Sequence, residues 1–441
     1  METVIDLKKY RSFIADTSLV KKSGKVRRLV GMILEGDGPA SPVGSLCRVV
    51  PRSGKTPIQA QVVGFRDNNT LLMPLGDIFG IEPGSIIETT EEFPSFNISP
   101  HLLGRVIDGL GEPLDGKGPI PLGSQYPIMG VPINPLKRTR INQSLDVGIR
   151  AINGLLTCAK GQRIGVLAGT GLGKSVLMGM VARNTSADVN VIALVGERGR
   201  EVKEFIEESL GPEGLKKSVV VAATSDQPPP VRLRGAYIAT TIAEYFRDLG
   251  KDVILMMDSV TRFALAQREI GLSAGEPPTT RGFTPSVFSL LPRLLERAGT
   301  REGSDGSITG LYTVLVEGDD LSEPVADAVM AVLDGHIVLS RELASHNHYP
   351  AIDILNSVSR LMIDVVSREY FEVTRKIKDL LATYREAEDL INIGAYAKGS
   401  NPKIDAAIQK IDAINTYLRQ DIMEKADMTQ SIERLNKILE D

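Results

Sequence analysis

The chain contains no tryptophan, only two cysteines, and few aromatic residues, which make up 5% of its 441 positions. Cys47 and Cys158 lie far apart in different segments, so they favour a reducing compartment and structural or inert thiols over a disulfide framework. No apolar run approaches the ~18–20 residues that a membrane-spanning helix needs. The formal net charge of -4 does not favour a general nucleic-acid-binding surface.

The N-terminal stretch METVIDLKKYRSFIADTS lacks the apolar core of a secretory signal and carries acidic residues. We therefore expect a cytoplasmic protein whose membrane association is peripheral and comes through partners only. Val4, Leu7, Tyr10 and Ile14 recur at three- and four-residue steps. This spacing fits a short amphipathic helix that docks another protein, and it fits a frayed terminus equally well. Residues 1–23 are treated as a separate N-terminal segment.

Residues 24–95 contain short β-rich runs such as KVRRLVGMIL and IQAQVVGF, separated by glycine, proline and asparagine. This pattern predicts a small all-β domain, either a barrel or a sandwich. The following stretch, Asp108 to Gly123, is dense in glycine and proline. We expect it to be a linker without regular structure.

Residues 145–365 show apolar runs of strand length, among them RIGVLAG, VNVIALVG, SVVVAATS, DVILMMD, ITGLYTVLVE and HIVLS, and helical segments separate most of them. The alternation predicts a parallel sheet covered on both faces, with the active site at the carboxyl ends of its strands. We assign residues 96–365 to this α/β domain. After Ser367 the strands stop, and residues 366–441 are expected to form a helical domain. One predicted helix there has an apolar face made of Ile404, Ile408, Ile411, Leu418 and Ile422.

The segment RIGVLAGTGLGKSVLMGM predicts a strand, a glycine-rich turn and a helix. Its centre fits the phosphate-loop pattern except that alanine replaces the first glycine. Glycines let backbone N–H groups surround a phosphate, and the helix N-terminus adds its positive end. We expect Lys174 to reach the β- and γ-phosphates and the Ser175 hydroxyl to bind Mg²⁺. The predicted nucleotide-binding residues of this loop are Ala168, Gly169, Thr170, Gly171, Leu172, Gly173, Lys174, Ser175 and Val176.

Carboxylates follow two other predicted strands. Asp258 ends the run DVILMMD, where an acid is usually a cap or a ligand, and the phosphate loop favours a Mg²⁺ ligand. Glu197 follows VNVIALV at the same expected edge of the sheet, where it could orient a water in line with the γ-phosphate. Glu201 is either an outer contact of the metal site or an ordinary acidic residue in the first turn of a helix.

The motifs GTGLGKS, GERGREV and MMDSVTRFA, in this order, resemble the catalytic subunits of rotary-type ATPases. PAIDILNSVS matches the signature decapeptide of F- and V-type ATPase subunits. Within this superfamily, RAINGLLTCAKGQRIGVLAGTGLGKSVLMGM, DSVTRFALAQREIGLSAGEPP and PSVFSLLPRLLERAG look most like the flagellar type III protein-export ATPases. The resemblance covers roughly residues 25–365 and is weaker beyond them. It implies an α/β fold with a RecA-like P-loop ATPase core and a parallel sheet, preceded by a small β-barrel domain and followed by a helical domain.

The resemblance also assigns roles residue by residue. Lys174 and Ser175 match the phosphate-loop lysine and metal ligand, Glu197 matches the glutamate that polarises the attacking water, and Asp258 matches the aspartate at the metal site. Arg198 matches an arginine near the γ-phosphate.

Further matches lie later in the chain. Arg262 matches an active-site arginine, Tyr349 the aromatic residue that packs on adenine, and Arg360 the arginine finger that reaches a neighbouring subunit. The loop Val316 to Pro324 resembles the one that faces a central stalk. The departures from the family pattern are Ala168 and Thr284, and neither of them touches the chemistry.

The family implies ATP and Mg²⁺ as ligands and a homohexameric ring. Because Glu197 and Arg360 occur in one chain, identical subunits can build complete sites at their interfaces. The implied partners are a stator-like regulator at the N-terminal segment, a coiled-coil central stalk, and the export gate with its chaperones and substrates. No nucleic acid is expected. The implied location is the inner face of the cytoplasmic membrane, at the export apparatus.

Four alternatives remain open at this point. A virulence (injectisome) secretion ATPase shares most of the motifs, although GTGLGKS and AQREIGL favour the flagellar branch. A catalytic subunit of an ATP synthase would have the same fold and site. A hexameric RNA translocase would want a basic, aromatic platform for stacked bases, which the chain lacks. A non-hydrolysing regulatory subunit is disfavoured by Glu197.

Overall fold

The computed structural model describes residues 22–54, 56–316, 318 and 320–440. The predicted helix in residues 1–18 lies outside these described residues, as do parts of the loop predicted to face a stalk. The chain divides into two compact units. One comprises the residues up to Pro94 together with Ile270–Glu276, and the other comprises Ser95–Glu269 and the residues from Pro277 onward. The four-part division at residues 23, 95 and 365 stays a prediction.

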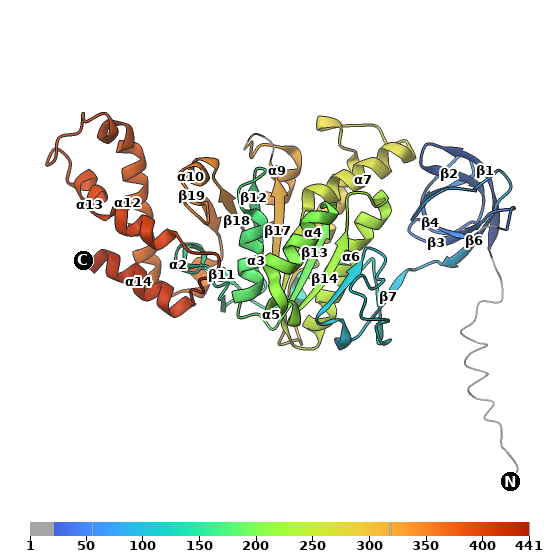
Figure 1. The fold of residues 1–441 in the computed structure, drawn as a ribbon, viewed down its shortest axis with the longest axis horizontal. Helices are drawn as coiled ribbons and strands as arrows, with labels where there is room; N and C mark the ends of the chain where they lie inside the picture. The colour runs from blue at the N-terminus through green and yellow to red at the C-terminus, as the bar shows by residue number, and fades with distance from the viewer. Residues whose placement is uncertain (1–21, 55, 317, 319, 441) are drawn as a thin grey trace, which may run out of the picture. The chain divides into compact units, whose positions relative to one another are not determined.

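The first unit contains a closed barrel of six antiparallel strands in the order β1-β2-β5-β4-β3-β6, seen in Figure 1. Alternate side chains such as Val26, Leu34 and Leu72 point inward and are buried. β4 and β5 are joined through Asp67 and Asn68, which both have positive φ, as a tight hairpin requires. The strands are β1 Ser23–Val30, β2 Ile33–Asp37, β3 Leu46–Val50, β4 Ile58–Arg66, β5 Asn69–Pro74 and β6 Ile86–Glu91.

The second unit is built on a nine-stranded sheet whose main path runs β19-β18-β12-β17-β15-β13-β14-β8. Neighbours on the path from β18 to β8 are parallel. The expected parallel sheet also carries two antiparallel additions, β19 beside β18 and the two-residue β16 beside β17. The strands are β8 Arg105–Asp108, β12 Arg163–Ala168, β13 Val189–Val195, β14 Ser218–Ala223, β15 Asp252–Asp258, β16 Gly299–Thr300, which pairs with β17, β17 Ser307–Leu315, β18 Gly335–Leu339 and β19 Ile352–Ser359.

Strand β8 was not predicted from the sequence. Only four residues long, it lies beside β14, whose paired residues follow more than 100 positions later. It is fixed by Arg105, whose guanidinium binds the Asp115 carboxylate at 2.7 and 2.9 Å. Two further two-stranded ribbons pair β7 Ser95–Ile98 with β9 Ser124–Pro127, and β10 Ser144–Leu145 with β11 Cys158–Ala159.

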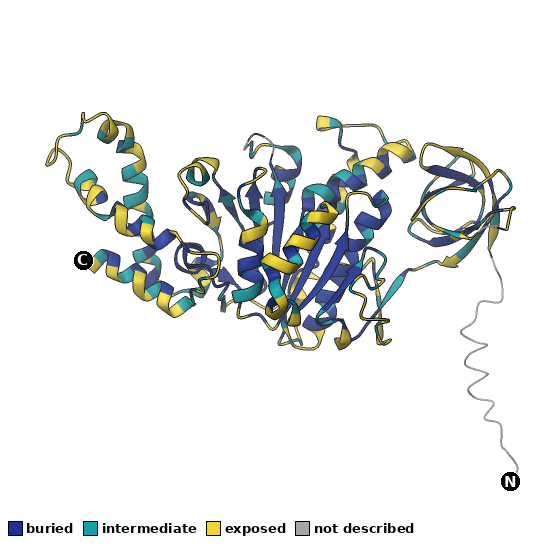
Figure 2. Ribbon diagram, viewed as in Figure 1, coloured by how far each residue is buried: buried dark blue, intermediate teal, exposed yellow. Residues whose placement is uncertain are grey.

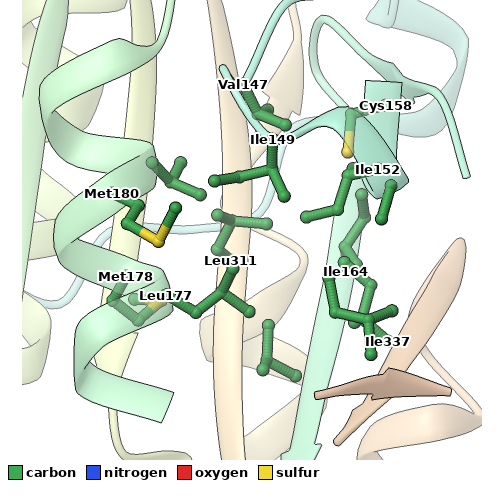
Figure 3. Close-up of a cluster of buried hydrophobic side chains, with 14 of the residues drawn as sticks. Val147, Ile149, Ile152, Cys158, Ile164, Leu177, Met178, Met180, Leu311 and Ile337 are labelled. Carbon is green, nitrogen blue, oxygen red and sulfur yellow. The ribbon is translucent and has the colours of Figure 1, made fainter. Parts of the chain in front are cut away.

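Helices cover both faces of the sheet. On one face α3 packs Leu177, Met178 and Met180 over Ile164 and Leu311 (Figure 3). On the other, Gly235 of α6 lies against β14, where an added Cβ would come 3.0 Å from the Cβ of Ala223. The central strands are accordingly buried along their length (Figure 2). The helices that precede the C-terminal region are α2 Arg150–Leu155, α3 Lys174–Asn184, α4 Gly199–Glu204, η3 Phe205–Leu210, α5 Gly211–Lys216, α6 Pro229–Asp248, α7 Val260–Ala274, α8 Pro285–Leu295, α9 Pro324–Met330, α10 Arg341–Ser345 and α11 Met362–Val365.

The C-terminal region is helical, comprising α12 Arg368–Asn392, α13 Pro402–Leu418 and α14 Met428–Glu440. The predicted apolar face of α13 is only partly correct. Ile411 and Leu418 are buried, but Ile408 is exposed and Ile422 lies beyond the helix end, half exposed. The helix ends early because the chain turns to place Gln420, whose amide Nε2 donates to the Gly148 carbonyl and whose Oε1 accepts from the Arg150 N–H.

Both cysteines are buried and form no disulfide. Burial raises the pKa of the Cys47 thiol to about 11 and that of the Cys158 thiol to about 12. At neutral pH both thiols are therefore protonated and unreactive. Among the described residues, no helix combines the length and the apolar character that crossing a membrane requires.

Candidate functional site

The glycine-rich turn between β12 and α3 forms an open loop. Gly171 and Gly173 adopt φ of +81° and +82°, a region that suits glycine and strains other residues. An added Cβ at Gly171 would meet no atom within 4 Å, so that side of the loop is free. Gly173 caps α3 without any side-chain hydrogen bond, which leaves the first N–H groups of an eleven-residue helix available to an anion.

Lys174, the first residue of α3, is held between two carboxylates. Its Nζ makes a short ion pair with Asp258 Oδ1 and lies 3.8 Å from Glu197 Oε1. All three side chains are largely buried. Asp258 ends β15, Glu197 lies two residues after the end of β13, and Lys174 begins α3 after the loop that follows β12. The register explains the meeting, because Leu194 of β13 pairs with Asp258 at the end of β15, and Glu197 follows three residues after Leu194.

Asp258 receives a second hydrogen bond that the sequence did not predict. Thr313 Oγ1, on the fully buried β17 between β12 and β15, lies 2.8 Å from Asp258 Oδ1. A threonine within an apolar strand looks like an ordinary β-former, so only the strand order assigns it to this site. The single hydroxyl proton has a second, more distant acceptor in the Met257 carbonyl at 3.2 Å, so the shorter contact with Asp258 is the favoured one.

Glu197 is an unusual carboxylate. Burial and the nearby charge of Asp258 raise its pKa to about 7, against the lowering effect of Lys174. Its Oε1 is buried and accepts no hydrogen bond from the part of the chain that the structure describes. A buried acceptor without a donor, aimed at a lysine, suits a group that orients a water molecule.

The carboxylates near the phosphate loop determine which kind of metal site the chain can form. The described residues hold no cluster of three or more His, Cys, Asp or Glu side chains. Mg²⁺ usually takes only one or two carboxylates and completes its shell with phosphates and water. Asp258, with the exposed Ser175 one position after Lys174, therefore fits a magnesium–nucleotide site and would not suit an all-protein metal site.

The remaining predicted residues surround this centre. Arg262 packs against Gly196. A Cβ added to Gly196 would come 2.9 Å from the Cβ of Arg262. The positive charge of Arg262 lowers the pKa of Glu197. Arg198 is exposed and pairs with Glu201 across 3.4 Å. Glu201 also acts on Glu197 through a side-chain hydrogen bond that helps to raise the pKa of Glu197, so it lies beside the site as well as in the first turn of α4.

A pocket of about 620 Å³ opens beside the phosphate loop. Tyr349, 42% exposed, forms one wall and Val176 of α3 another, and the Tyr349 ring would come 3.7 Å from a Cβ added to Gly173. The C-terminal region contributes Gln420 and Ile422, which the sequence had assigned to no site. A largely apolar slot that ends at a phosphate loop matches the shape of a nucleoside.

Arg360 does not join this cluster. It follows β19, which runs antiparallel to β18. Arg360 therefore lies at the end of the sheet where the parallel strands begin. The phosphate loop follows the other end of β12, about 20 Å away for a six-residue strand. Arg360 is exposed and makes no ion pair with any described residue.

A glycine-rich loop between a strand and a helix, a lysine on it, and an aspartate and a glutamate after neighbouring parallel strands together define a P-loop ATPase with a RecA-like core. The family models agree. They match the nucleotide-binding domain of the ATP synthase alpha/beta family over residues 148–359, its beta-barrel domain over residues 26–91, and the T3SS EscN ATPase C-terminal domain over residues 366–437.

Relatives of known sequence extend the match along the whole chain. The flagellum-specific ATP synthase of Bacillus subtilis is 54% identical over 428 residues, which cover 96% of each chain. The chain therefore belongs to the family of flagellar and type III secretion ATPases, and it is an ATPase that takes ATP as its substrate.

Solved structures give the same result. The assembled ATPase EscN from the type III secretion system of enteropathogenic E. coli has a TM-score of 0.89 at 44% identity, covering 94% of this chain and 100% of that one. EscN in complex with its central stalk EscO has a TM-score of 0.86 at 43% identity, with the same coverage.

Proposed function

We propose that this chain is the ATPase that energises type III export of flagellar proteins. The carrying observation is the full-length identity of 54% to a flagellum-specific ATP synthase, combined with a buried Glu197 beside Lys174 and Asp258. Two flagellum-specific ATP synthases, at 54% and 52% identity, exceed a type 3 secretion system ATPase of Xanthomonas euvesicatoria at 47%, although other flagellar relatives are as low as 45%. The two highest of these identities favour the flagellar assignment over the virulence one.

In the proposed reaction, the loop N–H groups and Lys174 bind the phosphates of ATP, and Tyr349 packs on the adenine. Ser175 and Asp258 would hold Mg²⁺, which when bound neutralises charge on the phosphate oxygens. Glu197 orients the attacking water toward the γ-phosphate. Lys174 exchanges its ion pair with Asp258 for the phosphates, and Thr313 keeps the Asp258 carboxylate in place.

We further propose that the sites are shared between subunits of a homohexamer. Arg360 is one strand length from the phosphate loop of its own chain, and a side chain of about 7 Å cannot span that distance. An exposed guanidinium that pairs with no carboxylate among the described residues is suited to stabilise charge on a phosphate of a neighbouring subunit. Arg198 and Arg262 are proposed to act on the γ-phosphate side of the same site.

The partners follow from the same relationship. We propose a coiled-coil stalk in the centre of the ring, as EscN has its central stalk EscO. A stator-like regulator at residues 1–23 and an export gate, chaperones and substrates complete the proposal. The protein would be cytoplasmic and would reach the membrane only through these partners.

The test is made in the bacterium that carries the gene. Deletion is expected to abolish flagella and motility, a plasmid copy to restore them, and a Glu197→Gln copy to fail despite normal protein levels. The matched control is Arg200→Gln, which changes an exposed helix-surface arginine whose only ion pair with a described residue is with Glu204 at 3.4 Å, and which should complement. Normal flagella in the deletion strain would overturn the proposal, and loss of effector secretion instead would favour the virulence alternative.

A further inference from the structure

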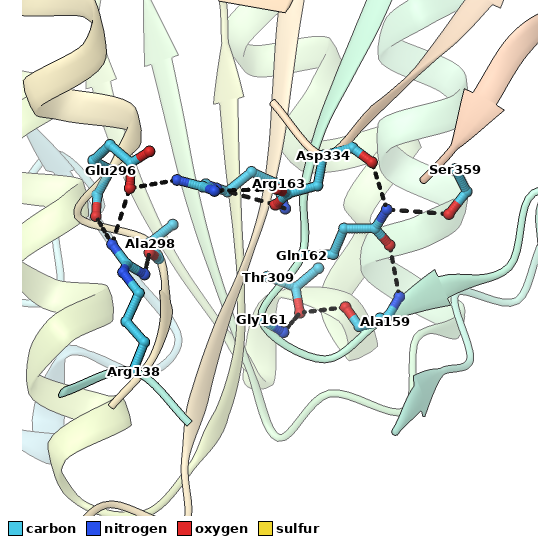
Figure 4. A network of polar contacts seen from close by, with 10 residues as sticks. All are labelled: Arg138, Ala159, Gly161, Gln162, Arg163, Glu296, Ala298, Thr309, Asp334 and Ser359. Carbon is cyan, nitrogen blue, oxygen red and sulfur yellow. Dashed lines mark hydrogen bonds and ion pairs between the residues drawn. The ribbon is translucent and has the colours of Figure 1, made fainter. Parts of the chain in front are cut away.

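We propose that Gln162 and Ser359 are positioning residues that fix the turn on which Arg360 is presented. The inference rests on the proposed function, since it assumes that Arg360 completes the site of a neighbouring subunit. The residues concerned lie at the amino ends of the parallel strands, opposite to the end that carries the phosphate loop. Figure 4 shows a polar network there.

Gln162 lies just before β12 and is fully buried. Its side-chain amide joins three separate stretches of chain. Nε2 donates to Ser359 Oγ at 3.1 Å and to the Asp334 carbonyl at 3.2 Å, while Oε1 accepts from the Ala159 N–H at 2.8 Å. A buried amide with all these bonds made is rigid, because losing any one leaves a polar group unpaired.

Ser359, which precedes Arg360, and the Arg360 backbone N–H are held by the same network. Ser359 Oγ accepts from Gln162 and donates to the Thr157 carbonyl at 2.9 Å. The Arg360 N–H donates to the Asp334 carbonyl at 3.0 Å. The main chain at Arg360 is therefore pinned, whereas its guanidinium is exposed.

Asp334 is itself immobilised. Its carboxylate accepts the Arg163 N–H at 3.0 Å and two guanidinium bonds at 3.1 Å each, and Arg163 Nη1 lies 2.5 Å from Glu296. Arg163 is the first residue of β12, the strand that ends at the phosphate loop. The strand that leads to the phosphate loop of one subunit therefore begins at the residues that hold Arg360 in place for the site of the neighbouring subunit.

Such rigidity matters because a displacement of about 1 Å in a group that stabilises a transition state can cost up to ~10²-fold in rate. A flexible turn would present the guanidinium over a wide range of positions. We expect Ser359→Ala to lower kcat about tenfold while leaving KM for ATP within about twofold, since the subunit's own nucleotide pocket lies at the other edge. Gln162→Met should do the same, and Ser359→Thr, which keeps the hydroxyl, should recover most of kcat.

The matched control is Thr309→Val. Thr309 is buried at the same end of the sheet. Its Oγ1 accepts from the Gly161 N–H at 2.9 Å and donates to the Ala159 carbonyl at 3.5 Å, but it has no bond to Asp334, Ser359 or Arg360. It should leave kcat nearly unchanged. An equal loss of kcat in Thr309→Val would mean that any loosening of this edge slows the enzyme, and would overturn a specific positioning role.

Mixed rings give the decisive readout. If Ser359 acts through Arg360, Ser359→Ala subunits belong to the same class as Arg360→Ala subunits. Mixing Ser359→Ala with Glu197→Gln should then raise activity above that of either alone, whereas mixing it with Arg360→Ala should not. Gain in the second mixture would overturn the inference while leaving shared sites intact. If Arg360→Ala and Glu197→Gln fail to complement each other, shared sites are wrong and the positioning role falls with them.

Discussion

Lys174 and Arg360 lie at opposite strand ends of one sheet, separated by about the length of β12. Lys174 is buried between carboxylates, whereas Arg360 is exposed and makes no ion pair with a described residue. No single chain can bring these two side chains to the same phosphate without dismantling its sheet.

Mixing two inactive variants should therefore restore activity. Glu197→Gln destroys the water-orienting side of an interface and Arg360→Ala the opposite side, so some interfaces in a mixed ring carry both intact residues. For random mixing at equal amounts, about a quarter of the interfaces are intact. Steady-state phosphate release measures the result. Activity no higher than the average of the two variants would contradict shared sites.

Glu197→Gln alone should separate binding from turnover. The substitution keeps the size of the side chain but removes the carboxylate, so ATP affinity should change by less than about threefold while kcat falls by ~10² or more. Equilibrium binding of a fluorescent ATP analogue and phosphate release give the two numbers. Retained turnover would return Glu197 to an ordinary charged residue at a helix start.

Thr313→Val should lower the affinity of the nucleotide site for Mg²⁺. The change preserves the β-branched shape in a buried strand but removes the hydroxyl that bonds Asp258, and a bond to a charged group contributes about 1.5–3 kcal/mol. We expect the Mg²⁺ concentration needed for half-maximal nucleotide binding to rise several-fold, as measured by titration at fixed ATP analogue. Thr313→Ser serves as the control and should behave like the wild type. Equal Mg²⁺ requirements in the valine and serine variants would exclude the role.

Acid should destabilise the protein through His348. This side chain is 3% exposed, and burial, with Arg419 nearby, lowers its pKa from 6.5 to about 4. The unfolded chain therefore binds a proton between these values that the folded chain rejects, so stability falls as pH decreases through that window. The loss between pH 7.5 and pH 5 is about 2 kcal/mol.

Urea unfolding at the two pH values checks the His348 effect. A His348→Gln variant, which cannot take up the proton, should show a flatter pH dependence than the wild type by roughly that amount. An identical pH dependence in both proteins would mean that His348 does not titrate across this window.

The sequence predicted which side chains near the strand ends lie close together. Lys174, Glu197 and Asp258 each follow or end a strongly apolar run, and parallel strands necessarily deliver such residues to one edge. Thr313 could not be predicted this way. Its contact with Asp258 depends on β17 lying between β12 and β15, and no local sequence pattern indicates the order of strands in a sheet.

The errors have similar causes. β8 is four residues long and its partner strand lies over 100 residues away, so no local periodicity marks it. Ile422 continues the spacing of α13 but lies beyond the helix end, because Gln420 bonds to Gly148 and Arg150 instead. A tertiary contact overrode an extrapolated helical pattern, and a predicted core residue lines the pocket beside the phosphate loop instead.

The reversed direction of β19 has a consequence for the newly made subunit. If Arg360 acts only across an interface, a solitary chain can take up ATP but lacks the means to cleave it efficiently. Specific activity should then climb with protein concentration, and ATP in the cell would be protected from unassembled copies. The antiparallel direction of β19 would then make assembly itself the event that starts hydrolysis.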